Sequence, residues 1–168
     1  MRYKTMITYF IPTPETAEQL KTQYRALAMI HHPDRNGNVA IMQEINNQFA
    51  KLFEQLKNTH DNANGERYTT QASTAETSAD YINVISRLIH FDGITIEIIG
   101  RFIWISGDTK PIKDILKELG FKWHSKKAMW YLSYPGYQRK SRRNMSIDEI
   151  RNMFGSETVE SKPAQRLV

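Results

Sequence analysis

His32, Pro33 and Asp34 are the residues whose types and spacing could do the most chemistry in this chain. Proline restricts the preceding residue to extended conformations and has no backbone N–H, so a helix should end here and the loop should be stiff. An imidazole and a carboxylate are therefore predicted at a rigid tip. Lys21 and Arg25 lie one helical turn apart before this tip. Such a surface suits a partner with a cationic pocket and an acidic flank.

Two amphipathic helices are predicted to position the tip. The first begins with Thr13 as N-cap and Pro14 in its first turn, and its stripe is Leu20, Tyr24, Leu27 and His31. The second extends to about residue 58, and its stripe is Ile41, Ile45, Phe49, Leu52 and Leu56. Helices joined by a short polar loop should pair antiparallel and present the loop outward.

The region around the tip also resembles a known family. Residues 24–36 are similar to helix II and the loop of the DnaJ-type co-chaperones, which contain a J domain, and residues 44–49 are similar to their helix III. Tyr9 and Phe10 resemble a remnant of helix I, so the resemblance covers about residues 5–58. In that family the loop and the basic face of helix II dock on a DnaK-type chaperone and trigger its ATP hydrolysis. The resemblance implies that His32, Pro33 and Asp34 carry the trigger and that Lys21 and Arg25 carry electrostatic docking.

The chain departs from the family at several points. Thr22, Ala26 and Ile30 stand where the family usually repeats basic residues, so steering toward an acidic partner should be weaker. The chain has no glycine-phenylalanine stretch and no cysteine, so the zinc-binding and client-binding parts of full-length DnaJ proteins are missing. The alternative interpretation is a helical hairpin in which the His-Pro-Asp loop is merely a turn.

Composition changes along the chain and predicts two domains. Residues 59–80 are rich in small polar side chains, which is typical of a flexible linker. Residues up to 80 contain eight Lys/Arg and nine Asp/Glu, whereas later residues contain fifteen and nine, so the net charge of +5 arises from the second half. We expect a J domain at 1–58, a linker at 59–80, a basic domain at 81–155 and a disordered tail at 156–168.

The second half is predicted to be a small α+β domain with two β-hairpins and helices, so that the whole chain is α+β. A first helix should begin at Ser78 or Asp80 as cap and include residues 81–89. The predicted strands are 94–99, 102–105, 121–123 and 128–133, and the other helices are 111–119 and 146–154. Ser146 and Glu149 form a capping box for the last helix.

Basic and aromatic residues alternate in this half, and the pattern favours contact with single-stranded or structured nucleic acid. The candidate contact residues are Lys122, Lys126, Lys127, Arg139, Lys140, Arg142 and Arg143. Each tryptophan could instead be a core residue, and lysine-rich turns are often only solvated. The runs 104–109, 116–123 and 129–131 resemble a small domain of phage and mobile-element proteins, and this resemblance carries no catalytic residue.

Enzyme chemistry is not expected. The histidines lack metal-ligand spacing, and no nucleophile stands beside a base, so no catalytic residue, metal or cofactor is predicted. We also expect no signal peptide, no membrane partner and a cytoplasmic location. The predicted function is a co-chaperone that recruits and stimulates a DnaK-type chaperone toward a target, such as a nucleoprotein, chosen by the basic domain. The alternatives are a nucleic-acid-binding accessory protein of a phage or mobile element and an inhibitor of host DnaK.

Overall fold

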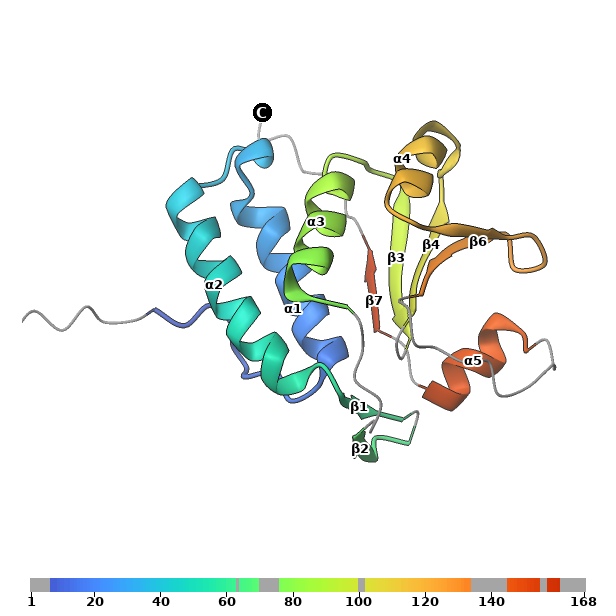
Figure 1. The fold of residues 1–168 in the computed structure, drawn as a ribbon, viewed down its shortest axis with the longest axis horizontal. Helices are drawn as coiled ribbons and strands as arrows, with labels where there is room; N and C mark the ends of the chain where they lie inside the picture. The colour runs from blue at the N-terminus through green and yellow to red at the C-terminus, as the bar shows by residue number, and fades with distance from the viewer. Residues whose placement is uncertain are drawn as a thin grey trace, which may run out of the picture.

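Helices and an antiparallel sheet make up the fold, so the predicted α+β class is confirmed. The structure, a computed structural model, describes residues 7–62, 64–69, 76–99, 102–133, 145–154 and 157–160. Three longer helices, α1, α2 and α3, lie together on one side of a five-stranded sheet (Figure 1). A separate two-stranded sheet, β1 and β2, lies at one end of these helices.

The first long helix, α1, spans Ala17–His31 and begins later than the sequence predicts. Thr16 is its N-cap, and the Thr16 hydroxyl accepts a hydrogen bond from the Gln19 backbone N–H at 3.3 Å. The predicted start at Thr13 and Pro14 is therefore wrong. Tyr9 and Phe10 are not helical either, although Phe10 is buried in the core.

The other two long helices have caps of the expected chemical type. Asn38 caps α2 (Val39–Leu56), since its side chain accepts hydrogen bonds from two backbone N–H groups of the first turn. Thr77 caps α3 (Ser78–Leu88) and forms a capping box with Asp80. The cap of α3 therefore precedes the predicted Ser78 or Asp80 by at least one residue.

The large sheet has the strand order β5-β6-β4-β3-β7, with every neighbour antiparallel. Both predicted hairpins are confirmed, since β3 pairs with β4 and β5 pairs with β6. The strands are β3 (Ile94–Ile99), β4 (Phe102–Gly107), β5 (Lys122–His124), β6 (Met129–Leu132) and β7 (Glu157–Glu160). β7 lies in the predicted disordered tail, so that expectation is wrong for residues 157–160.

Shorter helical elements connect the strands, as the sequence predicts. A 3₁₀ turn, η2 (Lys110–Ile112), leads into α4 (Lys113–Glu118) between β4 and β5. The last helix, α5 (Ile147–Phe154), has the predicted capping box between Ser146 and Glu149. Helix α5 lies on the opposite side of the sheet from α1, α2 and α3 (Figure 1).

The predicted linker is structured in the residues that the structure describes. It contains β1 (Thr59–Asp61) and β2 (Arg67–Thr69), which form a hairpin, and the beginning of α3. His60 and Glu76 are 3% and 5% exposed, and a flexible linker would not bury such polar side chains. The polar composition of residues 59–80 predicted a flexible linker, but polar side chains of this segment, such as His60 and Glu76, are buried in the fold.

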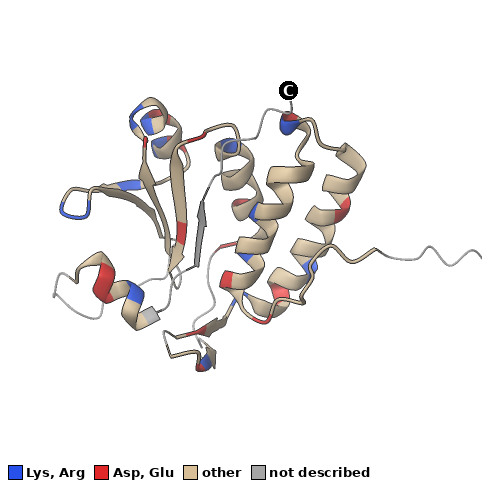
Figure 2. Cartoon of the chain, turned by 180° about the vertical axis from the view of Figure 1, so that it is seen from behind, with Lys and Arg blue, Asp and Glu red and all other residues tan. Residues whose placement is uncertain are grey.

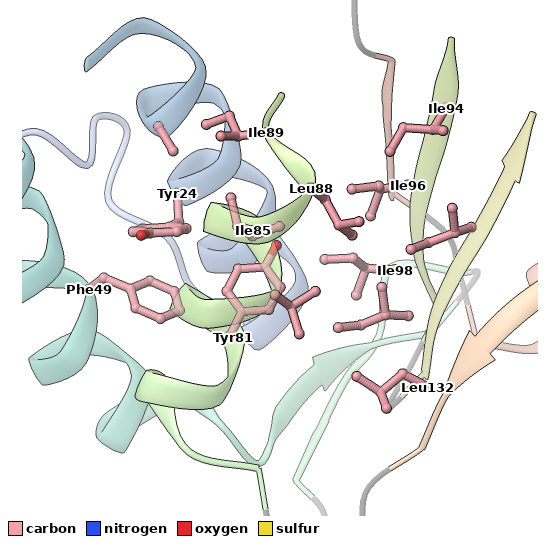
Figure 3. Close-up of a cluster of buried hydrophobic side chains, with 14 of the residues drawn as sticks. Tyr24, Phe49, Tyr81, Ile85, Leu88, Ile89, Ile94, Ile96, Ile98 and Leu132 are labelled. Carbon is pink, nitrogen blue, oxygen red and sulfur yellow. The ribbon is translucent and has the colours of Figure 1, made fainter. Parts of the chain in front are cut away.

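One large hydrophobic cluster contains residues of both halves that were predicted to be separate domains. Tyr81 of α3 is fully buried, and its ring lies 5.5 Å from that of Phe49 in α2 and 5.8 Å from that of Tyr24 in α1. Leu88, two turns further along α3, lies near Ile96 and Ile98 of β3 (Figure 3). Helix α3 therefore bridges α1 and α2 to the sheet.

Candidate functional site

The His-Pro-Asp segment forms the connection between α1 and α2. His32 has φ −65° and ψ 135°, the extended conformation that a following proline imposes, and its N–H donates to the Ala28 carbonyl at 2.9 Å. Helix α1 therefore ends where the sequence predicts. The next residues form a single 3₁₀ turn, η1 (Pro33–Arg35).

Backbone hydrogen bonds hold this loop in one conformation. The His32 carbonyl accepts from the N–H groups of Arg35 and Gly37, each at 2.9 Å. Asn36 has a left-handed backbone with φ 63°, which turns the chain back toward α1. Gly37 lies so close to α1 that a Cβ atom there would be 2.0 Å from the His31 carbonyl carbon.

Gly37→Ala is therefore expected to destabilise the protein by about 1–3 kcal/mol, because the loop would have to move away from the end of α1. The contact atoms belong to the His31 backbone and cannot rotate aside. Urea unfolding followed by circular dichroism measures the change. A variant as stable as the wild type would show that the loop does not approach α1 this closely.

Asp34 is the exposed group of the loop, and it already has partners within the chain. Its side chain is 50% exposed, and its Oδ2 lies 3.2 Å from His90 Nε2 and 3.5 Å from His32 Nδ1. The Asp34 backbone N–H donates to His32 Nδ1 at 3.2 Å, so the His32 ring has its acceptor nitrogen turned toward the loop. The carboxylate is thus held by His90, whereas the ring of His32 accepts from the backbone of the loop.

The loop also contacts the end of α3, which the sequence analysis missed. An Arg35 guanidinium nitrogen, Nη1, donates to the Ile89 carbonyl at 3.0 Å, and the next residue is His90, which contacts Asp34. The loop is directed outward, as the sequence predicts, and it also packs against the end of α3. No sequence signal links positions 34 and 90, because the contact depends on how α3 packs.

Lys21 is not on an exposed face. It is 3% exposed, and its Nζ lies 2.6 Å from Glu76 Oε2, with both side chains 4% exposed. The same ammonium lies 5.3 Å from the centre of the Tyr81 ring. The Lys21 side chain therefore lies in the interior of this structure, not on the exposed docking surface that the resemblance implies.

Arg25 is also buried, at 4% exposed, and burial lowers the pKa of its guanidinium from the usual value. Helix α1 is central in the fold and contacts α2, α3, β1, β3 and β7. Arg25 therefore also lies in the interior of this structure. Helical spacing correctly placed Lys21 and Arg25 on one face, but the chain itself covers that face.

A second buried pair lies near Lys21. His60 Nδ1 of β1 is in close contact with Glu18 Oε1 of α1, and their side chains are 4% and 9% exposed. The His60 ring also lies 5.4 Å from that of Tyr68 in β2. This pair fixes the small β1–β2 sheet to α1, and its residues are 42 positions apart.

The candidate nucleic-acid residues fall into two groups. Lys122 and Lys126 are exposed and Lys127 is partly exposed, all in β5 or the turn that follows it. The structure therefore brings these three together. Arg139, Lys140, Arg142 and Arg143 lie outside the described residues.

The tryptophans differ from one another in exposure. Trp104 and Trp130 are 4% and 8% exposed, as expected for core residues, whereas Trp123 is 50% exposed. This exposure shows that Trp123 is not a core residue. Its position on β5, the edge strand of the sheet, explains the exposure. Its ring still contacts that of Trp130 at 5.5 Å.

Comparisons with known proteins give no relative: no family model matches the chain, and no curated protein or solved structure is significantly similar to it. Within the described part of the chain, no helix is both long and apolar enough to cross a membrane. The same residues contain no group of three or more His, Asp or Glu side chains that could hold a metal ion.

Proposed function

We propose that this protein is a J-domain-type co-chaperone that binds a DnaK-type chaperone and stimulates its ATP hydrolysis. The observation that supports the proposal most is the half-exposed Asp34 carboxylate in a hydrogen-bonded loop between α1 and α2. A group that is held in place before binding loses little conformational freedom when a partner docks. A carboxylate can also form a strong charge-assisted hydrogen bond with a cationic partner group.

In this proposal the loop makes the principal contact, without a cationic helix face. Lys21 and Arg25 are both buried, so they add little to an encounter with an acidic surface. His90 holds the Asp34 carboxylate at 3.2 Å in the free protein. A cationic group of the partner would replace His90 at Asp34 on docking.

The sheet half would select the target to which the chaperone is recruited. The basic residues of the chain are concentrated in this half, and Lys122 and Lys126 are exposed there. Since α3 bridges the helices and the sheet, a target bound on the sheet would be held in a fixed relation to the loop.

Asp34→Asn is expected to abolish stimulation of single-turnover ATP hydrolysis by a bacterial DnaK. The substitution removes the charge of a side chain that is 50% exposed and keeps its shape, so the circular dichroism spectrum should not change. The matched control is Asp92→Asn, which removes a carboxylate from another exposed position and should stimulate as the wild type does.

Each other outcome has a defined meaning. Equal stimulation by the wild type and Asp34→Asn would contradict a trigger at Asp34. Binding of the wild type to DnaK without stimulation would indicate an inhibitor of that chaperone. If DnaK neither binds nor responds, the loop is only a turn and the proposed function is wrong.

A further inference from the structure

One face of the large sheet is directed away from the core helices, and its side chains follow from the strand register. Ile96, Ile105 and Trp130 lie side by side on the core face. Adjacent residues of a strand point to opposite faces, so the row Glu97, Trp104, Tyr131 and Lys122 lies on the other face.

Four aromatic side chains gather on this outer face: Phe102, Trp104, His124 and Tyr131, here called the aromatic face. The Tyr131 ring is central, with its centre 5.4 Å from that of Trp104, 6.1 Å from that of His124 and 6.5 Å from that of Phe102. Phe102, His124 and Tyr131 are all partly exposed, so they can contact a ligand.

Helix α5 packs on one part of the outer face. Ile147 and Ile150 of α5 pack against the apolar cluster that includes Trp104. Arg151 makes two hydrogen bonds to Glu97, at 2.6 and 2.7 Å, and these bonds raise the pKa of the Arg151 guanidinium. Arg151 of α5 therefore neutralises the charge of Glu97, the buried carboxylate on this face.

The end of the aromatic face at β5 and the turn that follows it is cationic. Lys122 is exposed and directly opposite Tyr131, and Lys127 Nζ lies 3.3 Å from His124 Nε2. Lys126 is exposed in the same turn. Figure 2 shows basic residues at the tip of the turn that joins β5 and β6, which projects from the sheet.

We infer that the aromatic face and the lysines beside it bind single-stranded nucleic acid. Unpaired bases can stack on Tyr131 and Phe102 while phosphates contact Lys122, Lys126 and Lys127, so one ligand uses both kinds of side chain. A duplex keeps its bases stacked on one another and cannot offer their faces to the rings. This site does not depend on the proposed co-chaperone activity.

Trp104 supplies an independent observation that points to a ligand. The indole N–H can only donate, and Trp104 Nε1 is buried with no hydrogen-bond partner among the residues that the structure describes. A buried donor without a partner is costly, whereas base and phosphate oxygens are good acceptors. Rearrangement of the rings when a base stacks would offer this N–H an acceptor.

Fluorescence titration of the full-length protein with oligo(dT) and oligo(U) in low salt tests the inference. Binding should quench tryptophan fluorescence, and Tyr131→Leu should weaken it about tenfold because one stacking contact is lost. Affinity should fall as salt rises. Replacing Lys122, Lys126 and Lys127 together by Ala should make the plot of log affinity against log salt less steep by about two units. The oligonucleotide that binds more tightly shows whether the site prefers DNA or RNA.

Two controls separate this site from general charge attraction and from the other sheet face. The first replaces Lys110, Lys113 and Lys117 by Ala, which removes the same charge from exposed positions of η2 and α4. The second is Trp123→Ala, which removes an exposed ring from the same hairpin but from the opposite face. Both should bind nearly as the wild type does.

Several results would overturn the inference. These are absence of binding in low salt, equal affinity for duplex and single strand, or a loss in Trp123→Ala as large as in Tyr131→Leu. An unchanged salt slope in the triple lysine variant would also overturn it. Because those lysines are exposed or partly exposed, the triple variant should keep its fold even if Tyr131→Leu does not.

Discussion

Lys21→Met should lower the free energy of unfolding by about 3–5 kcal/mol, the usual cost of removing one partner from a buried ion pair. Methionine can occupy the space of the lysine stem, so the loss comes mainly from the charge. Glu76 would remain 5% exposed without the ammonium that now lies 2.6 Å from its Oε2. The contact of the ammonium with the Tyr81 ring would also be lost.

Lys57→Met is the matched control, because the Lys57–Glu54 pair is closed at 2.8 Å but its side chains are 24% and 64% exposed. A pair in water contributes about 0.5 kcal/mol or less, so this variant should unfold almost as the wild type does. Urea unfolding gives both values. Adding Glu76→Gln to Lys21→Met should recover part of the loss, since the remaining buried group is neutral. A loss below about 1 kcal/mol in Lys21→Met would contradict burial of the pair.

The sequence predicted the local elements because local contacts determine them. Pro33 ends α1, the capping box of Ser146 and Glu149 begins α5, and runs rich in β-branched and aromatic residues form β3 and β4. These signals lie within a few residues of the elements that they define. The early start predicted at Thr13 failed because two threonines compete as N-cap, and Thr16 is the one that accepts from the helix.

The prediction failed where distant residues determine the environment. Lys21 and Glu76 are 55 positions apart, and each is polar enough to be assigned to the surface when seen alone. Asp34 and His90 likewise meet only because α3 packs on α1 and α2. For the candidate site, the sequence therefore indicated the loop and its residues but could not show that Lys21 and Arg25 are covered.

The packing of α3 also determines whether the chain unfolds as one unit. Tyr81 is fully buried, and its hydroxyl donates to the Lys21 carbonyl at 2.9 Å. Tyr81→Ala should therefore cost about 3–5 kcal/mol, since a large buried ring is removed. Tyr81→Phe, which removes only the hydroxyl, should cost about 1 kcal/mol.

Two spectroscopic signals report on the two halves, and in a single cooperative unit they must change together. Far-UV circular dichroism is dominated by the long helices, whereas tryptophan fluorescence reports on the sheet, because Trp104, Trp123 and Trp130 all lie in it. We expect coincident urea transitions in the wild type and an equal shift of both in Tyr81→Ala. Independent domains would instead unfold in separate transitions, and the fluorescence midpoint of the variant would stay closer to that of the wild type. Because Tyr81 contacts the rings of α1 and α2 while Leu88 of the same helix faces β3, loss of the ring should loosen the helices and the sheet together.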